Sequence, residues 1–226
     1  WLPPMVVMYA VTAPFDKGRY AIGWWFRRLG VAMAKVNPYW RFRRTGLRVA
    51  DPRRPYVVVS NHESFADILL ISHLPFEMKW LSKVEILKIP LIGWMMRMAG
   101  DIPIKRGFGP SAVEAMERCR ASLRNRVSVI FFPEGTRSVD GNMLPFKDGA
   151  FRLALEAGVP ILPLAVAGTR TALPKHDWRF NPARAIVEVL PPIETSGLNL
   201  EDLPQLKERV CATIQAARDA LRAQLA

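Results

Sequence analysis

A histidine and an aspartate stand five residues apart in this chain, at a spacing that suits proton transfer. His62 and Asp67 belong to the segment Asn-His-Glu-Ser-Phe-Ala-Asp (61–67), which follows the β-branched run of residues 56–60. On one continuous helix the two side chains would point about 140° apart. They can meet only if His62 lies on the loop after the strand and Asp67 in the first helical turn. The carboxylate would then hold one ring nitrogen and raise the basicity of the other, which predicts a general base acting on a substrate hydroxyl.

A lone histidine is more often a structural residue than a catalyst, so a second polar cluster matters. It follows the apolar run of residues 127–132. Pro133 cannot donate to a strand ladder and Gly135 permits a positive φ, so the strand should end there in a turn. The polar side chains of this turn are Glu134, Thr136, Arg137 and Ser138. The planar guanidinium of Arg137 suits a phosphate or a carboxylate, although an ordinary surface turn with a Glu–Arg pair is the alternative.

Two further segments accompany these clusters. Residues 100–107 form a short apolar pattern that ends in Lys105 and Arg106. Adjacent strand residues point to opposite faces, so only one of the two cations should enter a given cleft, and we favour Arg106. Residues 158–166 are typical of a buried strand and should build an apolar wall.

In this order, the four segments resemble the motifs of the glycerolipid acyltransferase family, most closely its 1-acylglycerol-3-phosphate (lysophosphatidic acid) acyltransferases. Asn-His-x-x-x-x-Asp matches the first motif. The resemblance makes His62 the catalytic base and Asp67 the residue that orients it. Gly-x-Ile-x-Ile-x-Arg matches the second motif and implies that Arg106 binds phosphate. Lys105 stands where the family often has an acidic residue, and it is an additional binding candidate.

The third motif, Phe-Pro-Glu-Gly-Thr-Arg-Ser, is matched without a substitution. The resemblance therefore implies that the residues of this turn bind the glycerophosphate: Glu134, Gly135, Thr136 and Arg137. Val-Pro-Ile-x-Pro matches the fourth motif, and the resemblance covers about residues 55–170.

The resemblance implies direct transfer of a fatty acyl group from an acyl thioester, either acyl-CoA or an acyl carrier protein. The acceptor would be the sn-2 hydroxyl of 1-acylglycerol 3-phosphate, and the product phosphatidic acid. We expect no metal, no cofactor beyond the acyl donor and no covalent acyl-enzyme. Two alternatives stay open. The acceptor could be glycerol 3-phosphate or another lysolipid, or the chain could be a non-catalytic lipid-binding membrane module.

Positive charge and aromatic residues are concentrated at the start of the chain. The net charge is +12, and residues 1–60 hold eleven Lys and Arg against two Asp. Four of the seven tryptophans lie in the same stretch. Cations beside Trp and Tyr are typical of a surface at the level of lipid headgroups. Nucleic-acid binding is the competing interpretation, but no recognisable nucleic-acid motif accompanies the charge.

Cysteine usage bears on the compartment. The two cysteines, Cys119 and Cys211, do not indicate a disulfide scaffold and favour a reduced, cytoplasmic setting. We therefore expect a protein on a membrane phospholipid surface, at the cytoplasmic face of the inner membrane, with no nucleic-acid partner.

The apolar pattern divides the chain into two parts. Residues 22–36 carry an apolar stripe at helical spacing, with Arg27 on another face. This stripe could contact lipid or the protein's own core. The uncharged residues 1–15 are too short to span a bilayer and could form an interfacial hairpin or part of a longer spanning segment. We predict an N-terminal interfacial, amphipathic helical segment at 1–44 and an acyltransferase domain at 45–226.

Strands and helices alternate after residue 45, which predicts an α/β layered domain with a largely parallel or mixed central sheet flanked by helices. Loops at strand ends should then bring His62, Arg106 and the Glu134–Arg137 turn into one cleft. The predicted strands are 47–50, 56–60, 78–81, 102–104, 127–132, 161–166 and 185–190. The predicted helices are 65–73, 84–98 with a break near Pro90, 111–124, 149–157 and 203–223.

Overall fold

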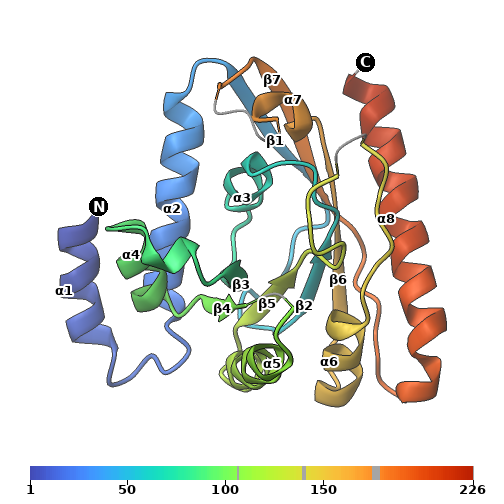
Figure 1. The fold of residues 1–226 in the computed structure, drawn as a ribbon, viewed down its shortest axis with the longest axis horizontal. Helices are drawn as coiled ribbons and strands as arrows, with labels where there is room; N and C mark the ends of the chain where they lie inside the picture. The colour runs from blue at the N-terminus through green and yellow to red at the C-terminus, as the bar shows by residue number, and fades with distance from the viewer. Residues whose placement is uncertain (106, 139–140, 175–178, 226) are drawn as a thin grey trace.

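The computed structural model describes the whole chain except residues 106, 139–140, 175–178 and 226. These described residues form a mixed seven-stranded sheet with helices on both faces (Figure 1). The strand order is β1-β7-β6-β2-β5-β3-β4, and each pair is parallel except β6 with β7. The predicted α/β architecture with a mixed sheet is confirmed. The strands are β1 (Trp40–Gly46), β2 (Val57–Ser60), β3 (Met78–Lys83), β4 (Ile102–Ile104), β5 (Ser128–Phe131), β6 (Ile161–Ala167) and β7 (Ala183–Val189).

Helices cover both faces because successive strand side chains point to opposite sides. Val57 and Val59 pack in one core with α5, α6 and α8, whereas Val58 packs in another with α3. Figure 1 shows α6 and α8 on one side of the sheet and α2 on the other. The helices are α1 (Leu2–Thr12), α2 (Tyr20–Val36), α3 (Ala66–Ile71), α4 (Ile92–Ala99), α5 (Gly109–Arg124), α6 (Gly149–Ala157), α7 (Thr169–Ala172) and α8 (Leu203–Leu225), with short 3-10 turns η1 (Ile86–Lys88) and η2 (Leu200–Asp202).

The parallel strands β2, β5 and β6 bring three loops to one edge of the sheet. Their carboxyl ends meet there because β2 pairs in parallel with both neighbours. The loops that follow them contain residues 61–65, residues 132–138 and Gly168. Gly168 has φ +89°, and a Cβ at this position would lie 2.0 Å from the carbonyl oxygen of Arg184. Only glycine fits this turn, which leads directly into α7.

Most predicted elements are confirmed, but the strand predicted at 47–50 is wrong. The observed strand is β1, so the boundary predicted at residue 44 falls inside a strand of the sheet. Alternation explains β1: Trp40 and Phe42 face inward and stack on each other, while Arg41 and Arg43 point outward. Because arginines fill the outward positions, the sequence of β1 lacks the apolar run that predicts a strand. The break near Pro90 is confirmed, since η1 and α4 are separate there.

A buried group of charges attaches α2 to the sheet. Arg27, which the stripe pattern places on a polar face, is only 7% exposed. Its guanidinium pairs with Asp101 and lies 3.5 Å from an oxygen of Glu77. Although burial opposes the charge, these two carboxylates hold the pKa of Arg27 above its ordinary value. The neighbouring Lys79 ammonium donates to Glu77 and to two backbone carbonyls, while burial lowers its pKa.

The N-terminal helix α1 packs beside α2 and α4. Met5 is fully buried in a small apolar cluster with Ile22, Met95 and Ala99. Val7 and Val11, on the same helix, are each 64% exposed. Across the described residues, no helix combines the length and the hydropathy required to cross a bilayer.

We predict that Asp101→Ala lowers the free energy of unfolding by about 3–5 kcal/mol, because it leaves the buried Arg27 with the more distant Glu77 as its remaining carboxylate partner. Urea denaturation followed by circular dichroism measures this loss. The control is Glu114→Ala, which removes the exposed i,i+4 pair with Arg118 and should change stability by less than about 0.5 kcal/mol. Equal losses in the two variants would mean that the buried pair does not anchor α2.

Candidate active site

The loop after β2 and the first turn of α3 bring His62 and Asp67 into contact, as predicted. The ring Nδ1 lies 2.8 Å from Oδ2 of Asp67. The same oxygen accepts the backbone N–H groups of Glu63 (2.8 Å) and Ser64 (3.0 Å), and Oδ1 accepts the hydroxyl of Thr169. A carboxylate held by these donors can only accept from the ring, so Nδ1 carries the proton. The Nε2 atom is then left as the basic nitrogen.

The surrounding protein fixes the position of His62. Its ring stacks on Phe132 with centroids 4.0 Å apart and an interplanar angle of 20°. Its backbone N–H donates to Oε1 of Glu134 at 2.7 Å, and its carbonyl accepts the N–H of Ser138 at 3.0 Å. The loops after β2 and β5 are therefore joined at the base itself.

Glu134 holds this arrangement together instead of facing an open site. Its second oxygen accepts the N–H of Leu144 at 2.9 Å, and the residue is only 5% exposed. Burial raises the pKa of Glu134 above its usual range despite its two backbone hydrogen bonds. Both carboxylate oxygens are thus bonded within the protein, and the position fits a residue that orients His62 better than one that touches substrate.

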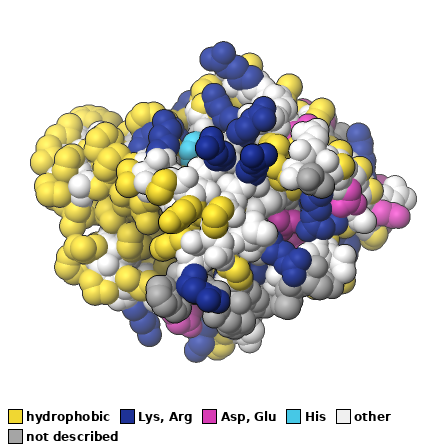
Figure 2. Space-filling model, turned by 90° about the horizontal axis from the view of Figure 1, so that it is seen from above, with side chains coloured by type: hydrophobic (Ala, Val, Ile, Leu, Met, Phe, Trp, Pro, Cys, Tyr) yellow, Lys and Arg dark blue, Asp and Glu magenta, His cyan; other side chains and the backbone are white. Residues whose placement is uncertain are grey.

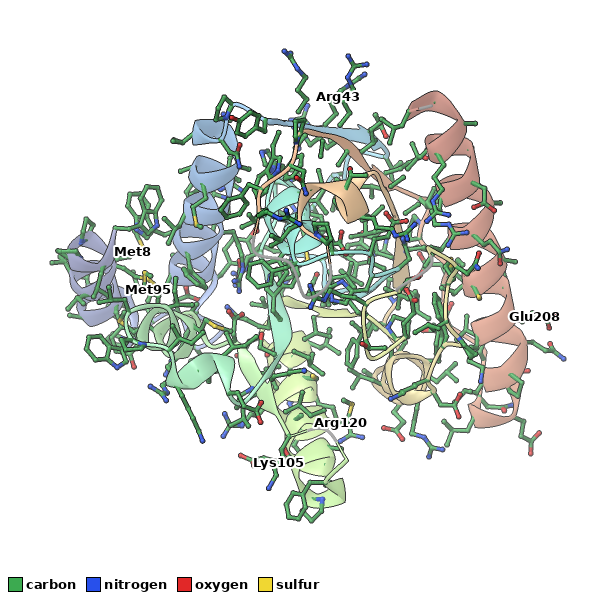
Figure 3. The ribbon with its side chains drawn as sticks, turned by 45° about the horizontal axis from the view of Figure 1, so that its top comes forward. Met8, Arg43, Met95, Lys105, Arg120 and Glu208 are labelled. Carbon is green, nitrogen blue, oxygen red and sulfur yellow. The ribbon has the colours of Figure 1, made fainter. Side chains whose placement is uncertain are left out.

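The other predicted binding residues differ in their position and in their exposure. Gly135 has φ +74°, while Thr136 is exposed and Arg137 half-buried in the same turn. Lys105 is exposed, its ammonium lies over the Phe108 ring, and Figure 3 shows it beside α5 at the edge of the molecule. The structure does not group Lys105 with His62. Arg106 lies outside the described residues.

A second acid beside the base is held by the last helix, a feature that the sequence pattern does not reveal. Arg222 of α8 donates to Oε1 of Glu63 at 2.6 Å and to the carbonyl of Gly141 at 2.6 Å. Burial and the nearby Asp67 raise the pKa of Glu63, and Arg222 opposes this rise. Arg218 also reaches the Gly141 carbonyl. The sequence offers one signal, which is that each arginine directly follows a residue of the helix face that packs on the core, Ala217 or Leu221.

Asn61 pins the same loop from the other side. Its amide nitrogen donates to the carbonyl of Val166 at 2.9 Å, and its oxygen accepts the N–H of Val166 at 2.8 Å. The Ser64 hydroxyl donates to the carbonyl of Leu173. Asn61 and Ser64 thus bind the loop that carries His62 to β6 and to the segment after α7.

Two apolar cavities lie near the base. One of about 300 Å³, here called the α2–α3 cavity, is lined by residues that include Phe26, Leu29, Phe65, Ile68, Trp80 and Met96. The other, of about 290 Å³ and here called the α5–α6 cavity, is lined by residues that include Leu81, Ile104, Met116, Phe132, Pro133 and Lys147. The ring centroids of Phe132 and Trp80 are 6.0 Å apart, so aromatic contacts connect His62 with both cavities.

The acidic and histidine side chains of the described site do not converge on one point. Within the part of the chain that the structure describes, no group of three or more His, Cys, Asp or Glu side chains could hold a metal ion.

The comparisons with known proteins agree with this geometry. A family model described as Acyltransferase matches residues 41–167. A chloroplast 1-acyl-sn-glycerol-3-phosphate acyltransferase of Brassica napus is 37% identical over 171 residues, which are 75% of this chain and 49% of that protein. The human 1-acyl-sn-glycerol-3-phosphate acyltransferase alpha is 42% identical over 161 residues, 70% of this chain and 57% of that protein.

A solved structure shares the fold as well. The crystal structure of the 1-acyl-sn-glycerophosphate acyltransferase PlsC from Thermotoga maritima has a TM-score of 0.68 and 31% identity, covering 80% of this chain and 73% of that one. Fold and His–Asp site thus define an α/β protein of the acyltransferase type. The family model spans more than half of the chain, and this chain belongs to the acyltransferase family. The chain spans about half the length of the curated relatives it matches.

We predict that Arg222→Ala lowers kcat on the order of 10- to 100-fold with little change in KM. It would leave the Glu63 carboxylate unpaired beside Asp67 and displace the loop that aims His62. Adding Glu63→Gln should restore much of the rate, because a neutral amide needs no cation. The defect should also shrink as pH falls, since a protonated Glu63, which faces Asp67, Arg218 and Arg222, needs no partner either.

Initial rates of the single and double variants across pH check this prediction. Arg209→Ala is the matched control, since this arginine is exposed on the same helix. Failure of Glu63→Gln to rescue would show that Arg222 only stabilises α8.

Proposed function

We propose that this chain transfers a fatty acyl group from an acyl thioester to the sn-2 hydroxyl of 1-acylglycerol 3-phosphate, giving phosphatidic acid. The observation that carries the proposal is the His62–Asp67 contact, which leaves Nε2 free to act as a base, and aromatic contacts connect the His62 ring with two apolar cavities. The relatives' names support this acceptor. The donor is either acyl-CoA or an acyl carrier protein.

Proton transfer through His62 accounts for the whole reaction. Nε2 removes the proton of the acceptor hydroxyl as its oxygen attacks the thioester carbonyl. The Asp67 carboxylate stabilises the imidazolium that forms. The tetrahedral intermediate then collapses, the carbon–sulfur bond breaks, and the departing thiolate takes the proton from Nε2. An ester and a free thiol result, and the base returns to its starting state.

The remaining parts of the site position the two substrates. Arg137, half-buried in the turn after β5, has a guanidinium suited to the acceptor phosphate. Arg106 has the same role by resemblance. The α2–α3 cavity offers an apolar lining for the acyl chain of the donor. Holding both substrates beside one base supplies much of the rate, because it replaces an encounter in solution by a bound geometry.

A non-catalytic lipid-binding module is the weaker alternative. A binding module has no need of an imidazole oriented by a fully buried carboxylate, and that carboxylate is costly to bury without its donors. Acceptor choice is a separate matter, and glycerol 3-phosphate or another lysolipid would fit the same chemistry.

We predict that His62→Ala and Asp67→Asn each lower kcat by about 10²–10⁴-fold, since each removes the oriented base. Initial rates are measured with a panel of lysolipids and with both acyl-CoA and acyl carrier protein donors, beside thermal melts. His73→Ala is the control, because the His73 ring contacts backbone carbonyls of α3 and does not contact His62 or Asp67. A folded His62→Ala protein with near-normal activity would falsify the assignment.

We also propose that the N-terminal helices rest on the membrane surface, at the cytoplasmic face of the inner membrane. Figure 2 shows hydrophobic side chains gathered at one end of the molecule, over the end where α1 lies in Figure 1. The exposed apolar residues of α1, α2 and α4 include Val6, Val7, Val11, Trp24, Met33 and Trp94. Contiguous exposed apolar surface of this kind favours a lipid interface, and the nearby cations would attract anionic headgroups.

We predict that Val7→Asp combined with Val11→Asp weakens binding to vesicles with anionic lipid and leaves the melting temperature unchanged. Both side chains are 64% exposed, so the change removes contact with lipid and not with the core. Sedimentation with liposomes at low and high salt measures binding. Val113→Asp is the matched control, because Val113 is 66% exposed on α5. Unchanged binding of the double variant would exclude α1 from the interface.

A further inference from the structure

The α5–α6 cavity lies on the opposite face of the sheet from the α2–α3 cavity. Trp80 and Leu81 are neighbours on β3, and they line the first and the second of these spaces respectively. Adjacent strand residues point to opposite faces, so the sheet itself lies between the two cavities. Phe132 lines the α5–α6 cavity and stacks on the His62 ring. The His62 ring thus contacts a wall residue of the α5–α6 cavity, and that Phe132 ring lies 6.0 Å from the Trp80 ring of the α2–α3 cavity.

Lys147 gives the α5–α6 cavity a cationic rim. Its backbone N–H donates to the carbonyl of Pro133 at 3.0 Å, which holds it against the turn that contains Arg137. A Cβ built on Gly135 would lie 2.8 Å from the Lys147 Nζ, so the ammonium sits directly over this turn. Among the described residues, no acidic side chain pairs with Lys147, whereas the nearby Lys207 pairs with Asp148.

The charges of the two cavities differ accordingly. The α2–α3 cavity contains Arg27, but Asp101 and Glu77 compensate its charge. The α5–α6 cavity combines an apolar lining with the ammonium of Lys147 at its rim. An uncharged hydrocarbon chain suits the first space, and an amphiphile with an anionic headgroup suits the second.

We propose that the α5–α6 cavity takes the acyl chain of the phosphate-bearing acceptor, with Lys147 binding its phosphate. The α2–α3 cavity then serves the acyl chain of the donor. This assignment rests on the proposed function and divides its two substrates between the two faces of the sheet. The acceptor hydroxyl, which lies between the phosphate and the acyl chain of the glycerol, would meet Nε2 beside Phe132.

The first arm of the test separates acceptor from donor. With detergent-dispersed substrates, Lys147→Ala should raise the KM for lysophosphatidic acid about 10-fold and leave the KM for the acyl donor unchanged. Lys147→Arg should stay near the wild type. Lys207→Ala is the matched control. An equal rise in both KM values, or a rise for the donor alone, overturns the assignment, because the donor also carries phosphate.

The second arm fills the cavity. Ala112→Phe, on the cavity wall, should raise the KM for a long-chain lysophosphatidic acid and spare an acceptor with a four-carbon chain. Val113→Phe is its control, since this exposed neighbour does not line the cavity. Equal effects on long and short acceptors would overturn the chain assignment.

A binding arm keeps this inference distinct from the proposed function. Titration of lysophosphatidic acid in detergent, followed by tryptophan fluorescence, needs no turnover. Weaker binding by Lys147→Ala than by Lys207→Ala supports the cavity assignment, whether or not the wild-type chain is active. A wild-type chain that acylates no lysolipid would overturn the proposed function and leave the cavity assignment standing. Equal binding by the two variants overturns the cavity assignment even when the wild-type chain is active.

Discussion

The site depends on one buried carboxylate that receives hydrogen bonds from separate parts of the chain. Asp67 is fully buried, and a charge there is tolerated only because each oxygen is bonded. Three donors come from its own loop, and the fourth, Thr169, follows β6. Thr169 reaches Asp67 only when β6 has paired with β2. The two Asn61–Val166 hydrogen bonds hold the end of β6 beside the loop, and the turn at Gly168 then places Thr169 next to Asp67. Formation of the sheet therefore assembles the base.

Two buried acids beside His62 bond to other parts of the protein. Glu134 connects the His62 backbone with Leu144, and Glu63 connects the same loop with Arg222. Each is 5% exposed or less, so contact with a charged substrate would require these internal bonds to break. Resemblance identifies Glu134 as functional. Burial and bonding partners then separate a side chain that holds the base from one that is free to bind substrate.

The parts of the structure that could be predicted are those that depend on local spacing. The His62–Asp67 contact follows from five residues across a loop and one helical turn, and most strands follow from short β-branched runs. β1 could not be recognised because arginines occupy its outward positions. The partner of Arg27 lies 74 residues away and that of Arg222 lies 159 residues away. The periodicity of a helix depends on neighbouring residues alone, so it does not encode ion pairs with partners this far away in the sequence.

The proposed reaction would place its two substrates in separate apolar cavities on opposite faces of the sheet, with His62 at the carboxyl ends of the strands between them. Substrates bound in this way would not compete for the same lining, and only their reactive ends would need to meet at His62. The buried pair of Arg27 and Asp101 adds a mechanical consequence. Asp101 also accepts the backbone N–H of Trp80, whose ring forms part of the α2–α3 cavity. Asp101 thus connects α2, a helix with exposed apolar side chains, to the strand that lines the α2–α3 cavity.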